Sequence, residues 1–201
     1  NRFVTPQESE HDLIEMRHAG TTLSDGLGLA LSKKFRNDKS FTITVIGDGS
    51  LAEGVALEAL NHISTTEVNQ LIIINDNGYA ISPGSGAIHQ HLSDLNSSVS
   101  EAVNLFTSLG YEYDGPHDGH NLKLLIEKFT EYKMSGGIKI IHIKTEKGKG
   151  YAPAKDSPIK MHFSNPFDLK TGEPTDKPNP RQVPTFATDA IITAMNTDDS
   201  I

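Results

Sequence analysis

Two short polar motifs follow apolar runs of the chain, and their residue types suit the binding of a cation and a phosphate. Residues 41–46 (FTITVI) lead into GDGS at 47–50, and residues 70–74 (QLIII) lead into NDN at 75–77. Glycines let the backbone approach a ligand closely, and the N–H groups at a helix start attract anions. The oxygens of Asp48 and Asn77 suit Mg²⁺, which completes its shell with phosphate, water or backbone oxygens.

Either motif alone is also typical of an ordinary turn, because Gly-Asp-Gly and Asn-Asp-Asn both favour tight turns. The combination favours a site, since each motif follows an apolar run that reads as a buried strand. Ligands of open parallel sheets bind where strands end and helices begin. Asp48 and Asn77 are therefore expected at one edge of a sheet, although 29 positions separate them in the sequence.

The elements that would carry these motifs alternate between strand and helix. This alternation predicts an α/β fold, a mostly parallel sheet with helices on both faces. The expected strands cover residues 41–46, 70–74 and 138–143, and the expected helices cover 22–35, 52–62, 98–109 and 122–133. Thr21 or Thr22 can cap the first helix, Asn121 the last of these, and Gly110 can end the third. Residues 78–94 are expected to form a loop.

The C-terminal quarter differs in composition from the rest of the chain. Residues 153–184 are rich in proline and poor in apolar clusters, which predicts a linker or surface arm. Residues 186–195 have the spacing of one amphipathic helix. We therefore expect a ligand-binding domain over residues 1–152, the arm over 153–184, and the start of a second domain over 185–201.

Composition excludes several classes of protein. The net charge of −8 disfavours a broad nucleic-acid-binding surface, and the absence of cysteine excludes disulfides and thiolate metal sites. No apolar run is long enough to cross a membrane. The N-terminal residues match neither a signal peptide nor a transit peptide, so a cytoplasmic location is the expectation.

Further motifs match one enzyme family in chain order. They are ESEHD at 8–12, RHAGTT at 17–22, EALNH at 58–62, AIS at 80–82, GPHDGH at 115–120, KGKGY at 147–151, PFD at 166–168 and TG at 171–172. With GDG and NDN at this spacing, the chain resembles the transketolase-like thiamine diphosphate enzymes, and among them the 1-deoxy-D-xylulose-5-phosphate synthases. The resemblance covers nearly the whole chain and implies their diphosphate-binding fold.

The resemblance also implies roles for single residues. Asp48 and Asn77 would bind Mg²⁺ together with the backbone carbonyl of Tyr79. Gly49 and Ser50 would lie against the diphosphate, and Asn77 would also belong to the cofactor-binding residues.

Four more residues are implied in cofactor binding. His18 and Ala19 would face the cofactor, and His18 would also act in catalysis by bonding or moving protons near the reacting oxygens. Lys147 and Tyr151 would belong to the segment that closes over the cofactor. Other interpretations remain open, since His18 also suits a helix entry and Lys147 a solvated loop. His117 and His120 flank an Asp-Gly turn and are expected to be structural.

The implied enzyme is a transferase that uses thiamine diphosphate and Mg²⁺. It would condense pyruvate with glyceraldehyde 3-phosphate to 1-deoxy-D-xylulose 5-phosphate with loss of CO₂, for isoprenoid and thiamine biosynthesis. A homodimer or a separate complementary subunit is expected, with neither nucleic acid nor membrane as partner. The family continues beyond both ends of these residues, so we expect this chain alone to be an incomplete enzyme.

Two alternatives to this enzyme stay open. GDG and NDN are shared by other transketolase-like enzymes, so a related reaction with another substrate pair fits them as well. A non-catalytic relative that binds the cofactor or a partner chain is the second alternative. It is favoured by departures from the family pattern: Arg17 stands where the family has glycine, and Ala19 and Gly20 replace two serines.

Overall fold

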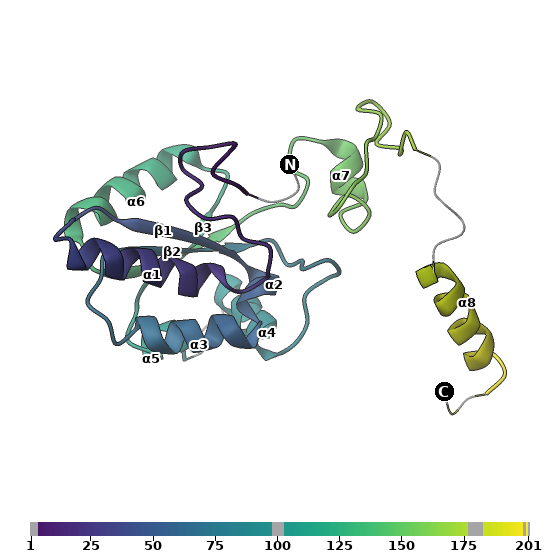
Figure 1. Ribbon diagram of the computed structural model, residues 1–201, viewed down its shortest axis with the longest axis horizontal. Helices are drawn as coiled ribbons and strands as arrows, with labels where there is room; N and C mark the ends of the chain where they lie inside the picture. The colour runs from purple at the N-terminus through teal and green to yellow at the C-terminus, as the bar shows by residue number, and fades with distance from the viewer. Residues whose placement is uncertain (1–3, 98–102, 177–182, 199, 201) are drawn as a thin grey trace. The chain divides into compact units, whose positions relative to one another are not determined.

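The computed structural model describes residues 4–97, 103–176, 183–198 and 200 of the chain. It divides the chain into two compact units, residues 1–149 and 150–201. The first unit holds every predicted site residue except Tyr151, and it is built around one sheet (Figure 1).

That sheet has four parallel strands in the order β1-β2-β4-β3. The strands are β1 (Thr42–Gly47), β2 (Gln70–Asp76), β3 (Glu112–Asp118) and β4 (Ile138–Lys144). Three of them confirm the predicted strands, with ends that differ by one or two residues. β2 is buried along almost its whole length, as expected of a strand covered on both faces.

Helices cover both faces of the sheet, which confirms the predicted α/β class. The helices of this unit are α1 (Thr22–Phe35), α2 (Asp48–Leu51), α3 (Gly54–Ile63), α4 (Ala87–Asn96), α5 (Leu105–Ser108) and α6 (Leu122–Ser135). α1 and α3 lie on one face, where Leu23 and Leu60 pack against Ile72 and Ile74 of β2. α6 covers the opposite face, where Leu125 joins Leu71, Ile73 and Ile141 in a second apolar cluster.

β3 was not predicted, because its sequence EYDGPHD reads as a turn. The strand lies at the edge of the sheet, where proline is tolerated, and its pairing with β4 shifts register between Asp114 and His117. The peptide bond Gly115–Pro116 is cis. Pairing with the buried β4 therefore imposes a strand where local sequence preference predicts none.

Several predicted helix limits were wrong. Residues 78–94, expected to be a loop, contain most of α4. The helix expected over 98–109 is reduced to α5, with residues 103 and 104 non-helical and 98–102 outside the described residues. The helix expected over 52–62 starts at Gly54, and a separate turn, α2, precedes it.

Two of the predicted helix ends are confirmed, and the cap expected from Thr21 is not. Asn121 caps α6, its side-chain oxygen accepting a hydrogen bond from Leu124 N at 3.1 Å. Gly110 follows α5 with a φ of 92°, as a helix-ending glycine should. Thr21 precedes α1 but does not cap it, because its hydroxyl instead donates to the His18 carbonyl at 3.1 Å.

The second unit contains two helices, α7 (Ala152–Asp156) and α8 (Val183–Met195). α8 confirms the helix expected over 186–195 and begins three residues earlier. None of its residues is buried. Within the described ranges, no helix has the length and apolar character needed to traverse a bilayer.

Candidate functional site

The two polar motifs lie side by side at the carboxyl edge of the sheet. β1 and β2 are parallel neighbours, and Gly47 pairs in register with Asn75. Asp48, which follows β1, and Asp76, the last residue of β2, are therefore neighbours, close enough for their charges to interact. The parallel pairing of β1 and β2 therefore brings GDG and NDN together, although 29 positions separate Asp48 from Asn77 in the sequence.

Asp48 is a buried carboxylate whose hydrogen bonding is incomplete. It begins α2 and is 3% exposed. Among the described residues, none donates a hydrogen bond to its Oδ2. Burial, and then the negative charge of Asp76, raise the pKa of the Asp48 carboxyl. An ionised carboxylate in this environment favours a bound cation, which would supply the missing partner.

Asp76 is equally buried but has a complete set of donors. Its Oδ1 accepts from Gly78 N at 3.1 Å, and its Oδ2 accepts from Asn96 Nδ2 at 2.7 Å and lies 3.2 Å from His142 Nε2. Burial alone would raise the pKa of Asp76, but the hydrogen bonds from His142, Asn96 and Gly78 lower it. The two neighbouring acids thus differ: both oxygens of Asp76 have protein donors, whereas Oδ2 of Asp48 has none among the described residues.

Asn77 and Tyr79 lie in a tight turn directly after β2. Asn77 Oδ1 accepts a hydrogen bond from Tyr79 N at 3.0 Å, and Gly78 between them has a φ of 76°. Such a φ favours glycine at this position. An amide oxygen accepts two partners, so Asn77 Oδ1 keeps a lone pair for a cation.

The GDG turn and the segment after NDN are in direct contact. A Cβ placed on Gly49 would lie 2.6 Å from Ala80 Cβ, so only glycine allows this approach. Lys147 joins the same place, since its Nζ donates to the Ala80 carbonyl at 3.0 Å and lies 5.2 Å from the centre of the Tyr79 ring. Burial lowers the pKa of the Lys147 ammonium, against the attraction of Asp48.

Other predicted site residues lie in different surroundings. Ser50 is half-buried in α2, beside Gly49. His18 and Ala19 are exposed in the segment before α1. This segment packs closely against α3 at Gly20, where an added Cβ would lie only 2.9 Å from Val55 Cγ1. Tyr151 lies in the second unit, with its ring 6.0 Å from that of Phe167.

Arg17, which departs from the family pattern, and the two histidines expected to be structural lie as follows. The Arg17 guanidinium, 64% exposed, hydrogen-bonds to Glu15, its neighbour two residues earlier. His120 Nε2 accepts from Glu146 N at 2.9 Å, a structural contact in a turn. His117, expected in the same turn, lies instead in β3, with Nε2 2.7 Å from Asp114 Oδ1.

Sequence reasoning missed the residues behind the NDN turn, namely His142, Asn96 and Tyr113. His142 is fully buried in β4, and its Nδ1 lies 2.7 Å from the Tyr113 hydroxyl. A signal for His142 existed, because it is the one imidazole in the apolar run IKIIHI. No comparable signal existed for Asn96 or Tyr113, which lie in elements that were predicted wrongly or not at all.

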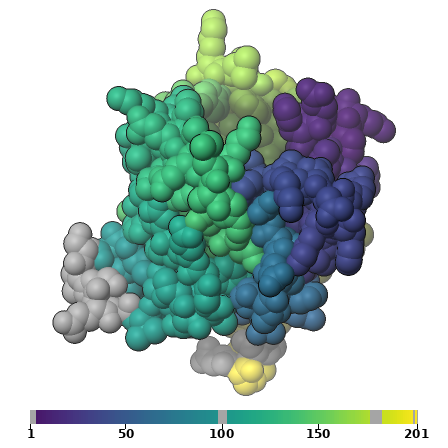
Figure 2. Space-filling model, turned by 90° about the vertical axis from the view of Figure 1, so that its left-hand side faces the viewer, coloured from purple at the N-terminus to yellow at the C-terminus, as the bar shows by residue number. Residues whose placement is uncertain are grey.

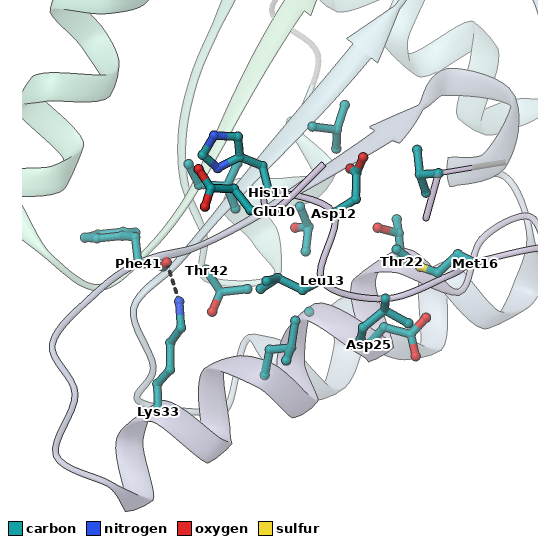
Figure 3. A pocket seen from close by; sticks show the side chains of 17 residues that line it. Glu10, His11, Asp12, Leu13, Met16, Thr22, Asp25, Lys33, Phe41 and Thr42 are labelled. Atoms are coloured by element: carbon teal, nitrogen blue, oxygen red, sulfur yellow. Dashed lines mark hydrogen bonds between the residues drawn. The ribbon is translucent and has the colours of Figure 1, made fainter. Parts of the chain in front are cut away.

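A cavity of about 650 Å³ lies elsewhere, between the N-terminal segment, α1 and β1. Figure 2 shows that segment beside α1, and Figure 3 shows Glu10, His11 and Asp12 of the ESEHD motif on the cavity wall. Lys33 Nζ donates to the Phe41 carbonyl at 2.7 Å at one end of it. Neither Asp48 nor Asn77 lines this cavity, so it is separate from the candidate site.

The donor set at the carboxyl edge fits a magnesium ion that also binds phosphate. The described ranges contain no group of three or more His, Cys, Asp or Glu side chains placed to hold a metal alone. A cation beside Asp48 would therefore need amide, backbone and external oxygens. Magnesium commonly takes such a mixture, with one or two carboxylates and the oxygens of a phosphate ligand.

Comparisons with known proteins agree with this architecture. The sequence model of the 1-deoxy-D-xylulose-5-phosphate synthase family matches residues 1–103 and 95–145. The synthase of Histophilus somni strain 2336 is 36% identical over an alignment of 219 positions, which includes 92% of this chain and 35% of that protein. The synthase of Brevibacillus brevis is 33% identical over an alignment of 236 positions, which includes 99% of this chain and 37% of that protein. This chain spans about a third of the length of these relatives, and it belongs to the 1-deoxy-D-xylulose-5-phosphate synthase family.

Proposed function

We propose that this chain forms the diphosphate- and magnesium-binding part of a thiamine diphosphate-dependent 1-deoxy-D-xylulose-5-phosphate synthase. The reaction is the condensation of pyruvate with glyceraldehyde 3-phosphate, with loss of CO₂. One observation carries the proposal: in a chain of this family, the buried Asp48 Oδ2 lacks a hydrogen-bond donor among the described residues, beside the Asn77 turn.

In this proposal, Mg²⁺ is held by Asp48, Asn77 and the backbone carbonyl of Tyr79. The incomplete hydrogen bonding of Asp48 and the spare lone pair of Asn77 Oδ1 support these assignments. The diphosphate oxygens would complete the metal's shell from the side of Gly49 and Ser50. Lys147 would add a positive charge, which its contact with Ala80 keeps close to the turn.

Thiamine diphosphate, when bound, supplies the nucleophilic carbon and the electron sink needed for decarboxylation of pyruvate. This chain anchors the cofactor's charged end and neutralises it, which fixes where the reacting carbon lies. His18 would hold a proton near the reacting oxygens. Tyr151 would help to cover the cofactor.

The proposal extends to the setting of the enzyme. We propose a cytoplasmic protein that works as a homodimer or with a complementary subunit, and whose product enters isoprenoid and thiamine biosynthesis. Residues 1–152 would form the diphosphate domain, 153–184 a linker, and 185–201 part of a pyrimidine-binding domain. The family resemblance of the motifs supports these assignments.

The test of the cofactor site is the substitution Asp48→Ala. Calorimetric titration of the complete enzyme that contains this chain, with thiamine diphosphate and Mg²⁺, should show that metal-dependent binding is lost. Thermal stability without metal should be unchanged or higher, because the substitution removes a buried carboxylate whose Oδ2 lacks a donor. Asp38→Ala serves as the control, because it removes an exposed carboxylate that precedes the start of β1, at the end of the strand away from Asp48.

Unchanged cofactor affinity in the Asp48→Ala protein would contradict the assignment. The substrate pair needs its own measurement. In the complete enzyme that contains this chain, CO₂ release from labelled pyruvate should depend on glyceraldehyde 3-phosphate and yield deoxyxylulose phosphate. Activity with a ketose phosphate donor instead would favour another transketolase-like reaction.

A further inference from the structure

A buried hydrogen-bonded network lies behind the proposed metal site. Its centre is Asp76, the middle residue of NDN, for which sequence reasoning gave no role. Three donors surround the carboxylate: Gly78 N at 3.1 Å, Asn96 Nδ2 at 2.7 Å and His142 Nε2 at 3.2 Å. The donors come from the turn, from the last residue of α4 and from β4. Asp76 therefore ties the turn to two separate elements of the fold.

Tyr113 holds the second ring nitrogen of His142. Its hydroxyl lies 2.7 Å from His142 Nδ1, within hydrogen-bond distance. An ionised carboxylate can only accept, so the hydrogen bond between His142 and Asp76 requires a hydrogen on Nε2, the ring nitrogen that faces Asp76. The ring of Phe106 stacks on Tyr113 with centroids 5.5 Å apart and holds the phenol in place.

This arrangement fixes the Asp76 carboxylate from the protein side, beside Asp48. With its oxygens engaged by protein donors, Asp76 is a poor candidate for direct metal binding. Its fixed position instead determines where the Gly78 N–H lies. Gly78 in turn positions the side-chain oxygen of Asn77 before it and the backbone carbonyl of Tyr79 after it.

Resting on the proposed function, we propose that His142 and Asn96 are positioning residues of the magnesium site, which act through Asp76 on the Asn77–Tyr79 turn. Partners behind metal-binding residues orient those residues, and their loss typically lowers metal affinity by about 10- to 100-fold. A purely structural network would affect stability instead and leave the affinity of the folded protein for the metal unchanged.

The test uses the complete enzyme that contains this chain. It measures the Mg²⁺ affinity at saturating thiamine diphosphate, by calorimetry and by competition with Mn²⁺ followed by electron paramagnetic resonance. His142→Leu should weaken Mg²⁺ binding by about 10-fold or more. His142→Gln should recover most of the affinity, because its amide N–H lies the same number of bonds from the backbone as the imidazole Nε2–H. The Mg²⁺ concentration for half-maximal activity should rise in the leucine variant, with kcat restored at high Mg²⁺.

A second variant decides the matter if His142→Leu does not fold. Asn96→Ala removes one donor to Asp76 at the end of α4. Its matched control is Asn69→Ala, before the start of β2, where Nδ2 donates to the Lys39 carbonyl at 3.1 Å and Oδ1 accepts from Gly137 N at 3.0 Å. Both variants lose amide hydrogen bonds, but only Asn96→Ala should weaken Mg²⁺ binding, by several-fold.

Two results would overturn the inference, namely equal Mg²⁺ affinities for the Asn96→Ala and Asn69→Ala proteins, or a folded His142→Leu protein with wild-type affinity. Failure of the proposed function itself is distinguishable through Asp48→Ala. If that variant loses Mg²⁺ while the His142 and Asn96 variants do not, the metal site stands and the positioning role falls. If Asp48→Ala also keeps wild-type affinity, the metal site is not where we propose it.

Discussion

Replacing Gly26 by alanine should destabilise the protein, although alanine is the better helix former. Gly26 lies on the buried face of α1, beside Leu23 and Leu27, and presses against β1. A Cβ added there would lie 2.0 Å from Thr44 Cγ2 and 3.1 Å from Gln70 Nε2. The Thr44 methyl is a short branch of a buried strand residue, so the helix must move away from the sheet to make room.

The magnitude follows from the distances. Carbon atoms in ordinary contact are about 3.5–4.0 Å apart, so α1 would have to shift outward by about 1.5 Å or more. Overpacking of this kind costs about 1–3 kcal/mol, and so severe an overlap belongs at the upper end. Glycine-to-alanine replacement inside a helix returns about 1 kcal/mol. We therefore expect Gly26→Ala to lower the free energy of unfolding by about 2 kcal/mol.

Gly28→Ala provides the matched control, because it is the same substitution two residues further along α1. A Cβ there meets no atom within 4 Å, so only the helix preference acts, and stability should rise by up to about 1 kcal/mol. Urea denaturation followed by circular dichroism measures both variants. Equal changes in the two proteins would refute the reasoning, since the contact with Thr44 would then carry no cost.

Two further predictions concern the site and its neighbourhood. Gly49→Ala should weaken magnesium-dependent binding of thiamine diphosphate, because its Cβ would lie 2.6 Å from Ala80 Cβ and push the GDG and NDN turns apart. Gly54→Ala, whose Cβ would meet no atom within 4 Å, should leave this binding unchanged. Calorimetric affinities for the cofactor compare the two variants. The second prediction concerns Asp114. Burial alone would raise the pKa of this carboxyl, but hydrogen bonds from Lys128, Tyr132 and His117 lower it to about 2. Because this folded-state pKa lies below the ordinary value of 3.8, the stabilisation is present above about pH 4 and is lost as pH falls toward 2. Asp114→Asn should therefore cost about 1 kcal/mol at pH 7, after allowance for solvent screening, and less at pH 3; a cost independent of pH in urea titrations would contradict this assignment.

The sequence by itself was sufficient for the elements whose signals are local. The apolar spacing of residues 22–35 predicts α1, the β-branched runs predict β1, β2 and β4, and Asn121 predicts the start of α6. Each signal lies within one element and does not depend on what packs against it. The placement of GDG and NDN after two such strands was enough to predict that they meet at one edge of a sheet.

Tertiary structure decided what depends on distant partners. β3 is a strand because β4 offers it hydrogen bonds, although its own residues favour a turn. The different states of Asp48 and Asp76 follow from donors that lie 20 and 66 positions away from Asp76, in Asn96 and His142. A carboxylate in a sequence looks the same whether or not donors will surround it. Its role follows from burial and from neighbours that the folded chain brings to it, and those exist only once the sheet has formed.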